Sequence, residues 1–412
     1  MARETFLAGL DLGSTAVRVV VGQRQPNDAA LHIVGAAEHP SDGISKGVVA
    51  SIEDAVSSIS QTLEKVERMT GIPVEHATVG ISGTHILSQD SHGVIAVARP
   101  DGEVKEEDVE RAIEAAQAVA TPPNYEILHV IPRSFTLDNQ RGIKDPVGMS
   151  GTRLEVDAQI IQGLSAQLKN LTKCVYRTSV DIDELVLGVL GAAEACLTKR
   201  QRELGVTLVN IGGATTSMVV FEEGDVLHAK VLPVGAGHVT NDIAIGLRTS
   251  IELAEKVKLE YGTALATDVG KREEINLEEF EGGESAVVSR QHVAEIIEAR
   301  LEEIFSMVDK ELKAIDRSAL LPAGIVLTGG GAKLPGVVDL GKKVFRLPAS
   351  VGFPTNVTSA IDRVNDPSFT TAVGLALWGG QAEQKGGGFN VPGLATVPEM
   401  TKKIRGWFKN FF

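Results

Sequence analysis

The pattern of apolar positions predicts two similar halves in this chain. In the first half, short apolar runs over residues 6–10, 17–22 and 31–36 are separated by turn-forming residues and predict three strands. The same strand–turn–strand–turn–strand order recurs over residues 206–231. Such a repetition indicates an internal duplication.

Apolar residues at spacings of three and four predict helices in both halves. These lie over residues 52–66, 109–119, 250–261 and 293–312. Thr249 and Glu252 have the spacing of a capping box at the start of the third helix. Residues 84–160 combine several strand candidates with one helix, which predicts a small α+β insertion.

Composition then excludes several classes of protein. The chain has 412 residues, 43% of them hydrophobic, which is enough for a sizeable core. Its net charge of −14 argues against a nucleic-acid partner, because nucleic-acid binding usually needs a basic face. Two cysteines exclude a disulfide framework. The sequence contains no apolar stretch long enough to predict a transmembrane helix.

A turn of small residues after the first strand is a candidate phosphate site. The strand ends at Asp11 and the turn holds Gly13, Ser14 and Thr15, with Arg18 shortly after. Glycine lets backbone N–H groups approach a phosphate, and hydroxyl groups add donors. Asp11 is a candidate Mg²⁺ ligand through water. The alternative is an ordinary hairpin turn with aspartate as a turn former.

Two further glycine turns complete the pattern. The second offers another phosphate site, at Asn210, Gly212, Gly213, Ala214 and Thr215. The third follows a buried strand, where a helix could begin, at Gly329, Gly330 and Gly331. Each turn alone is weak evidence, whereas the three in this order indicate a nucleotide site.

The three turns together resemble the superfamily of actin, sugar kinases and heat-shock-chaperone ATPases. The resemblance implies an α/β fold with two duplicated domains, actin-like, that close over ATP and Mg²⁺. It implies that Glu255 and Lys258 bind the ribose, although a solvated helix face would explain both. Segments 180–195 and 366–376 resemble the two connecting helices.

Further motifs resemble one branch, the FtsA family of bacterial cell-division proteins. They lie at residues 234–243, 296–300 and 327–332, and the insertion stands where that family has its own subdomain. The resemblance implies a tether of FtsZ filaments that recruits downstream division proteins and polymerises with itself. It implies a peripheral position on the cytoplasmic face of the membrane, at the division septum. Asn210 departs from the aspartate of many relatives, which argues against fast hydrolysis.

This resemblance gives an expected domain layout. The first domain comprises residues 1–83 and 164–200, with the inserted subdomain at 84–163. The second domain follows at 201–362 and has a nucleotide-covering part at about 240–300. The second connecting helix spans residues 363–380, a flexible linker 381–397, and an amphipathic helix 398–412.

The last residues have the pattern of a helix that lies in a membrane surface. One helical face is apolar and consists of Met400, Ile404, Trp407, Phe408, Phe411 and Phe412. Basic residues flank this face, at Lys402, Lys403, Arg405 and Lys409. Apolar anchors beside cations favour an anionic lipid surface. The alternative is a helix that docks on the protein itself or on a partner.

Three roles remain open from the sequence. Asp183 or Glu184 are candidates to position the attacking water, or are acids at the start of a helix. Arg290 and Arg300 are candidates to receive the acidic C-terminal tail of FtsZ. The alternative is that both are ordinary solvated helix residues or pair within their helix with Glu295 or Glu303. We expect at most a slow ATPase. The rivals are a small-molecule kinase of the same superfamily and an actin-like scaffold of a pilus or a shape-determining system.

Overall fold

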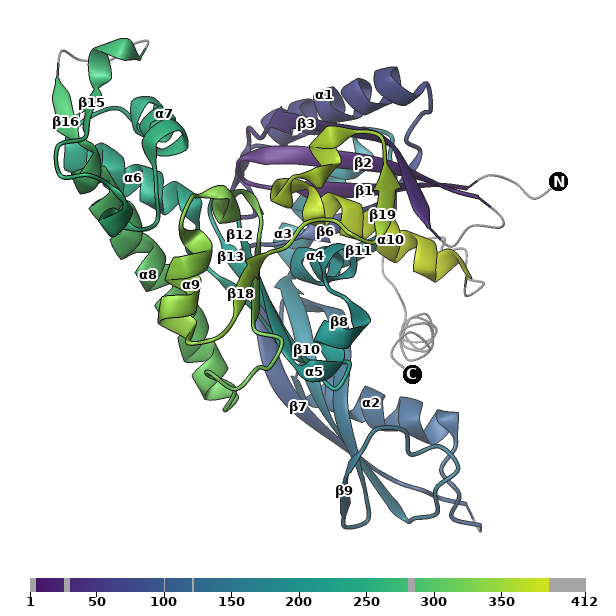
Figure 1. Ribbon diagram of the computed structural model, residues 1–412. Coiled ribbons are helices and arrows are strands. Elements are labelled where there is room, and N and C mark those ends of the chain that lie inside the picture. The colour runs from purple at the N-terminus through teal and green to yellow at the C-terminus, as the bar shows by residue number, and fades with distance from the viewer. Residues whose placement is uncertain (1–4, 26–29, 100, 121, 281–285, 385–412) are drawn as a thin grey trace.

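A computed structural model describes residues 5–25, 30–99, 101–120, 122–280 and 286–384 of the chain. The protein has two halves, each built on one mixed sheet, and a separate subdomain that extends from the first half (Figure 1). Most of the predicted linker and all of the predicted C-terminal amphipathic helix lie outside the described residues.

The first half is a six-stranded sheet between two layers of helices. Its strand order is β11-β6-β1-β2-β3-β19, with bounds β1 (Thr5–Leu12), β2 (Ala16–Arg24), β3 (Leu31–Pro40), β6 (His76–Ile81), β11 (Asp181–Leu187) and β19 (Val357–Ser359). The first three strands form an antiparallel meander, and β6 runs parallel to β1. One face packs against α1 (Ile52–Thr70) and α3 (Ser165–Tyr176), and the other against α10 (Thr370–Gln384).

The second half repeats this plan. Its sheet has the order β14-β13-β12-β17-β18, with bounds β12 (Val206–Ile211), β13 (Thr216–Glu222), β14 (Asp225–Leu232), β17 (Ile325–Thr328) and β18 (Ala349–Val351). Again an antiparallel meander is followed by a parallel strand, β17, next to its first strand. The duplication predicted from the sequence is therefore confirmed.

Helices of the second half cover the outer face of its sheet. They are α6 (Ala236–Leu247), α7 (Ile251–Tyr261), α8 (Arg290–Ala314) and α9 (Val337–Phe345). A small two-stranded sheet, β15 (Glu274–Asn276) with β16 (Val287–Ser289), lies at the start of α8. The short helix α5 (Lys199–Leu204) precedes β12.

The inserted subdomain has its own sheet and core. Its strands follow the order β7-β10-β8-β9, with bounds β7 (Ile86–Ala96), β8 (Tyr125–Leu137), β9 (Gln140–Ile143) and β10 (Arg153–Leu164). The buried apolar side of α2 (Glu106–Ala120) packs on one face of this sheet. The small hairpin β4 (Ile44–Ser45) with β5 (Val48–Val49) completes the strands of the described residues.

The two halves are joined where α4 (Gly188–Cys196) crosses α10. A Cβ atom on Gly374 would lie 1.7 Å from the carbonyl oxygen of Gly191, so the crossing needs glycine. Gly9 of β1 also packs closely on α10, because its Cβ would lie 2.0 Å from the carbonyl oxygen of Ala372. The expected small-residue crossing between the connecting helices is thus present.

Three details differ from the sequence-based expectations. Helix α10 continues to Gln384, into the range expected as linker. Strand β19 pairs with β3, so the chain returns to the first half before residue 362. The N-cap of α7 is Ser250, whose hydroxyl accepts from the backbone N–H of Leu253, and the capping box expected at Thr249 is wrong. Among the helices of the described ranges, none has both the length and the apolar character to cross a bilayer.

Candidate nucleotide site between the halves

The first glycine turn joins β1 to β2, and hydrogen bonds from residues that follow β3 hold it in place. The backbone N–H of Gly47 donates to Ser14 Oγ at 2.9 Å, and the N–H of Ser41 donates to the carbonyl oxygen of Thr15 at 3.0 Å. The β4–β5 region thus supports this turn. Ser14 keeps its own hydroxyl hydrogen available for a ligand.

The second glycine turn joins β12 to β13 and is held by the start of α6. The N–H of Gly212 donates to the carbonyl oxygen of Thr215 at 2.9 Å, which closes the hairpin. The N–H groups of Ala236 and Gly237 donate to the carbonyl oxygens of Gly212 and Gly213, at 2.8 and 2.7 Å respectively. Ala214 lies within the same turn.

The two turns come from opposite halves and meet in space. A Cβ atom on Gly213 would lie 1.9 Å from Thr15 Oγ1, so the turns are in direct contact and any side chain at Gly213 would separate them. Nearby, the hydroxyls of Ser82 and Ser217 lie 3.0 Å apart, again one from each half. The sequence order placed these turns nearly two hundred residues apart, and the duplicated fold brings them together.

Asp11 lies at the end of β1 with a perturbed carboxyl group. Burial raises its pKa to about 6, although the Arg18 guanidinium on the paired strand acts in the opposite direction. Arg18 itself forms an ion pair with Glu38 at 3.2 Å and lies 5.5 Å from the ring centre of Phe369. Arg18 therefore already has two partners, and its contact with a phosphate stays a prediction.

A half-buried carboxyl with a raised pKa fits a cation site. Bringing a divalent ion near Asp11 would favour its charged form and offset the cost of burial. Aspartate oxygens and waters are the ligands that Mg²⁺ takes beside substrate phosphates. The described residues contain no cluster of three or more His, Cys, Asp or Glu side chains that would form a protein-only metal site.

Asn210 occupies the corresponding place in the second half. Its Nδ2 donates to Thr371 Oγ1 on α10 at 3.0 Å, which ties the second half to the connecting helix. Its Oδ1 lies against the third turn, because a Cβ on Gly329 would be 2.2 Å away. Thr371 was not among the residues expected at the site, and only the fold reveals its position.

The third glycine turn follows β17. Gly329 has φ of 84°, a conformation that favours glycine, and Gly331 packs against Ile211 of β12. A Cβ on Gly330 would meet no atom within 4 Å, so this residue alone of the three faces open space. Residues 330–333 form a short 3-10 helix where the sequence suggested the start of an α-helix.

Glu255 and Lys258 form one polar group with a residue of α6. Lys258 Nζ lies 2.5 Å from Glu255 Oε2 and donates to Thr240 Oγ1 at 2.8 Å, and Thr240 also contacts Glu255. The Lys258 side chain is only 7% exposed, whereas that of Glu255 is 41% exposed. The alternative that both belong to a solvated helix face is therefore wrong for Lys258. Thr240 was not expected from the sequence.

The two acids proposed to position water lie elsewhere. Both belong to β11, so the alternative that they start a helix is wrong. Asp183 is 3.2 Å from His76 Nδ1, and Glu184 accepts from Trp378 Nε1 at 3.1 Å. Strand register places Val186, and not these acids, level with Asp11 across β6. The structure does not bring Asp183 or Glu184 to the turns.

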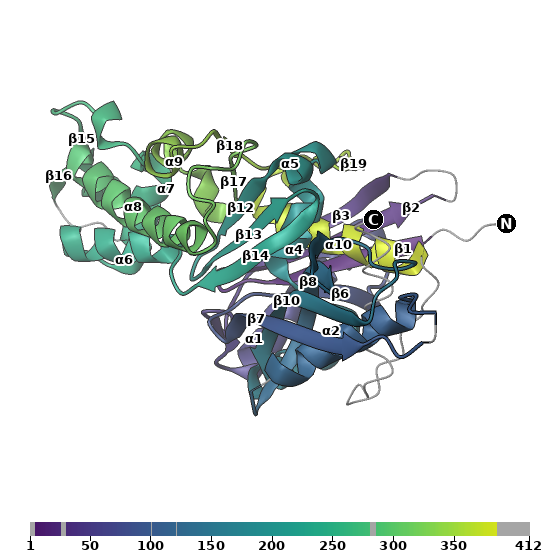
Figure 2. The ribbon, with the colours of Figure 1, turned by 90° about the horizontal axis from the view of Figure 1, so that it is seen from below.

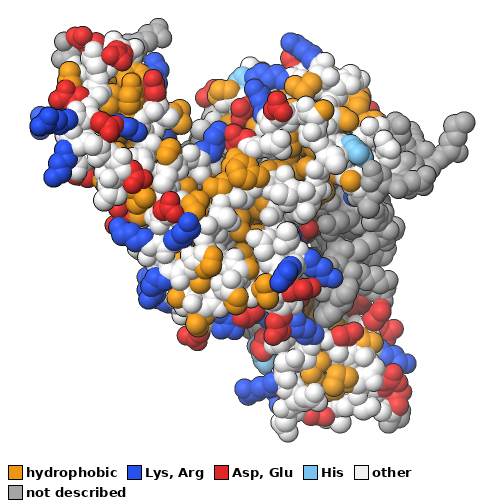
Figure 3. Space-filling model, viewed as in Figure 1, with side chains coloured by type: hydrophobic (Ala, Val, Ile, Leu, Met, Phe, Trp, Pro, Cys, Tyr) orange, Lys and Arg blue, Asp and Glu red, His pale blue; other side chains and the backbone are white. Residues whose placement is uncertain are grey.

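Both candidate arginines for FtsZ already have partners. Arg290 donates to the carbonyl oxygen of Tyr261 at 3.1 Å and lies 2.5 Å from Glu273 Oε2, so its partners lie outside its own helix and differ from those of the alternative. Arg300 makes a two-pronged contact with Asp242 of α6, at 2.5 and 3.0 Å. It also lies 2.5 Å from Glu303 Oε2, as the alternative predicted. Figure 3 shows basic and acidic side chains interspersed over this part of the molecule.

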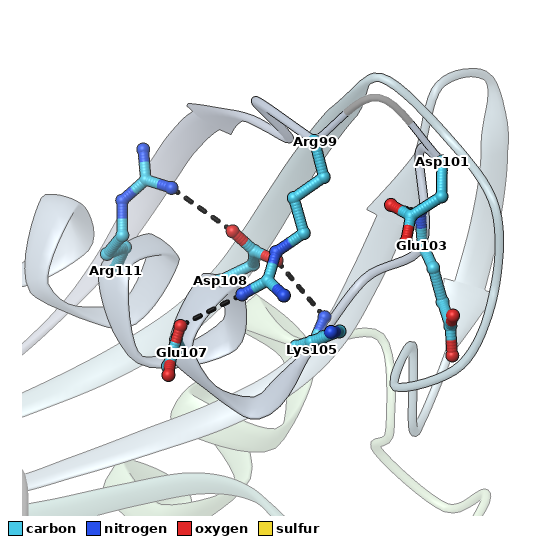
Figure 4. Close-up of polar contacts among 7 residues, drawn as sticks. All are labelled: Arg99, Asp101, Glu103, Lys105, Glu107, Asp108 and Arg111. Atoms are coloured by element: carbon cyan, nitrogen blue, oxygen red, sulfur yellow. Dashed lines mark hydrogen bonds and ion pairs between the residues drawn. The ribbon is translucent and has the colours of Figure 1, made fainter.

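A separate polar cluster orders the start of α2 in the inserted subdomain (Figure 4). The buried Asp108 carboxylate accepts from the backbone N–H of Lys105 at 3.1 Å and from Arg111 Nη1 at 3.1 Å. Arg99 lies 2.9 Å from Glu107 and 3.7 Å from Asp108. These charges satisfy one another, so the cluster stabilises the start of α2 in the inserted subdomain.

Comparison with known proteins identifies the family. The family model "Cell division protein FtsA" matches residues 207–374, and the model "SHS2 domain inserted in FTSA" matches residues 83–162. A relative named cell division protein FtsA from Pseudomonas aeruginosa is 40% identical over 99% of this chain and 98% of its own length. The chain belongs to the FtsA family. Further relatives of that name are 38% identical over 91% of the chain (Bacillus subtilis) and 33% identical over 99% (Escherichia coli K12).

Solved structures agree on the fold. A PilM–PilN type IV pilus biogenesis complex matches with a TM-score of 0.66 at 16% identity, covering 90% of this chain and 98% of the other. MreB5 of Spiroplasma citri bound to ADP matches with a TM-score of 0.52 at 12% identity, covering 97% and 98%. The protein is thus a cell-division protein of the FtsA family with an actin-like α/β fold.

Proposed function

We propose that this protein is an ATP-binding, actin-like tether that holds FtsZ filaments at the cytoplasmic membrane. The observation that carries the proposal is the contact between the two glycine turns, one from each half, at Thr15 and Gly213. Two turns that present backbone N–H groups and hydroxyls to a shared space suit the phosphates of one nucleotide. The family's role in cell division supplies the context for the tether.

In this proposal each turn has its own task. Ser14, Thr15 and the second turn, at residues 212–215, bind the phosphates, and Asp11 holds Mg²⁺ through water. Gly330 lies against the adenosine, because it alone in the third turn faces open space. Glu255 and Lys258 bind the ribose, with Thr240 holding both in place. The magnesium ion would screen the phosphate charge when bound.

Calorimetry with Mg-ATP tests the site. Gly330→Asp places a charged side chain in the space assigned to adenosine and should abolish binding. Gly142→Asp is the matched control, since its Cβ also meets open space but lies on β9 of the inserted subdomain. Because aspartate at a left-handed φ of 75° carries some backbone strain, circular dichroism should first show that both variants are folded. Unchanged ATP affinity in a folded Gly330→Asp protein would remove the third turn from the site.

The membrane part of the proposal rests on residues 398–412. Their apolar face with aromatic side chains and their flanking cations have the composition of a helix that lies in a lipid surface. Six apolar residues on one face, with four basic residues beside them, favour an anionic leaflet. Such an anchor makes the protein peripheral and leaves the nucleotide site free in the cytoplasm.

Partners are assigned to different parts of the molecule. We place the acidic tail of FtsZ on the second half, over residues 235–300, where Arg290 and Arg300 would exchange internal partners for the tail. The inserted subdomain would bind downstream division proteins and would mediate self-association into filaments. Because Asp183 and Glu184 point to other partners, hydrolysis would be slow at most. The family match makes the rival small-molecule kinase and pilus or shape-determining scaffold unnecessary.

A further inference from the structure

The inserted subdomain contacts both halves of the protein. Its buried side chains Ile131 and Ile161 belong to the same core cluster as Leu190 of α4 and Phe221 of the second sheet. Figure 2 shows β8 and β10 beneath β14, and the strands of the two sheets pack together there. The inserted subdomain therefore packs against both halves of the protein, and not only against the first half from which it extends.

The first polar anchor lies at the connecting helices. His129 Nε2 of β8 accepts from the backbone N–H of Leu187 at 2.9 Å, and Leu187 is the N-cap residue of α4. No side chain of its own caps that helix start, so the imidazole supplies an acceptor from the inserted subdomain. The His129 ring also meets Trp378 of α10 edge-on, with 6.0 Å between ring centres.

The second anchor lies on the second half, at the edge strand β14. Gln159 of β10 is only 1% exposed, and its Oε1 accepts from the backbone N–H of Ala229 at 2.9 Å. Its Nε2 lies 3.1 Å from His228 Nδ1, and His228 Nε2 lies 3.3 Å from Glu311 Oε2 of α8. One side chain of the inserted subdomain thus satisfies two groups of the second half.

These contacts determine the proton on His228. Since the Ala229 N–H requires the oxygen of the Gln159 amide, the NH₂ group must face His228. His228 Nδ1 then accepts, and its single proton lies on Nε2, where it donates to Glu311. A second proton on Nδ1 would place an N–H donor opposite the NH₂ donor of Gln159, and the contact between the two side chains would be lost.

A third anchor holds the tip of the β13–β14 hairpin. Lys144, just after β9, donates to the carbonyl oxygen of Glu223 at 2.8 Å and lies 3.0 Å from Asp225 Oδ2. The hairpin is held at its tip by Lys144 and at its middle by Gln159. Any rotation of the second half about the crossing of α4 and α10 must move this hairpin relative to the inserted subdomain.

We propose that the inserted subdomain is a strap across the hinge, and that its Gln159–His228 contact couples the closing of the nucleotide cleft to the position of the subdomain. The inference rests on the proposed nucleotide binding. The two glycine turns touch in the structure in which the Gln159 contact is made, so we assign this arrangement as the closed one, which the contact would then favour. By linkage, nucleotide must then tighten the contact to the same extent.

The neighbours of His228 keep this contact sensitive to acid. Burial lowers the pKa of His228, Arg133 of β8 lowers it further, and Glu311 of α8 and Asp90 of β7 raise it. Neutral imidazole is thus the form present at pH 7.5. Because the pKa of His228 is lowered, the imidazole takes up its second proton only at a pH below the ordinary histidine range, and that protonation removes the Gln159 contact.

Hydrogen exchange of the wild-type protein with and without Mg-ATP is the first test. We expect ATP to slow exchange over residues 225–232 and 153–164 at least threefold. Wild-type protein that does not bind Mg-ATP would refute the proposed function itself. Wild-type protein that binds it with no change in exchange at these strands would refute the strap alone. This measurement needs no variant and so does not depend on one folding.

Gln159→Leu is the second test, with Gln140→Leu on the exposed β9 as control. The Gln159 variant should bind Mg-ATP three- to tenfold more weakly at pH 7.5 and lose the exchange response, whereas the control should match wild type. The ratio of the two dissociation constants, variant to wild type, should fall toward one as the pH is lowered and His228 becomes protonated, because the protonated imidazole loses the contact. Wild-type affinity in a folded Gln159→Leu protein would overturn the proposal.

Discussion

Asp11→Asn should stabilise the nucleotide-free protein, although it removes a proposed ligand of Mg²⁺. Burial raises the pKa of this carboxyl from 3.8 to about 6, so the folded state binds the proton more tightly than the unfolded state. Its contribution to stability is greatest below pH 3.8 and is lost as the pH rises through 6. At pH 8 the charged, half-buried carboxylate therefore opposes folding.

The magnitude follows from the shift. About two pKa units, at 1.36 kcal/mol each, set an upper limit of about 3 kcal/mol. Asp11 retains some contact with solvent, so we expect a gain of about 2 kcal/mol at pH 8 for the isosteric, neutral asparagine, and roughly half of that at pH 5. The same variant should lose the Mg²⁺ dependence of ATP binding.

Urea unfolding followed by circular dichroism, without nucleotide, measures this effect. Asp138→Asn is a control of opposite sign, because hydrogen bonds from Thr152 and Arg153 hold the pKa of the exposed Asp138 below its usual value. The same substitution there should destabilise the protein at pH 8. A lower unfolding midpoint for Asp11→Asn at pH 8 would refute the reasoning and make Asp11 a structural residue.

Three more changes test other parts of the molecule. Gly374→Ala should cost about 3 kcal/mol in urea unfolding, because its Cβ would lie 1.7 Å from the Gly191 carbonyl oxygen; a stable variant would mean the helices separate easily. Arg290→Glu with Arg300→Glu should weaken binding of an FtsZ tail peptide in fluorescence anisotropy, with a melting curve to detect loss of their internal ion pairs; unaltered binding would exclude both. Trp407→Glu should abolish sedimentation with anionic liposomes and leave the melting temperature unchanged, whereas a destabilised protein that still sediments would contradict the anchor.

The repeated strands were predictable because alternation and turns are local properties. The meander of β1 to β3 and its repeat in β12 to β14 follow from short apolar runs between turn residues. β11 and β19 were missed as strands, since their edge positions depend on β6 and β3, far away in sequence. The N-cap of α7 was misplaced by one residue because Thr249 and Ser250 both carry a hydroxyl.

The candidate site was predictable in its turns and not in its contacts. The glycine turns at residues 13, 212 and 329 can be recognised in the sequence, because glycine is the residue that allows another backbone to approach closely or a left-handed φ to be adopted. Whether Arg18 reaches a ligand or pairs with Glu38 depends on the strand beside it. The roles of Thr240 and Thr371 depend on helix packing, which one sequence does not reveal.

The return of the chain through β19 has a consequence for synthesis on the ribosome. Residues 206–351 contain every strand of the second sheet without interruption, so this half can fold as soon as it emerges. The half that is made first must wait, because its sheet lacks the edge partner of β3 and the helix beneath β1 until β19 and α10 have been made. The nascent first half thus presents an open strand edge and an uncovered apolar face for most of translation, and it is the part of the chain that a chaperone would have to protect.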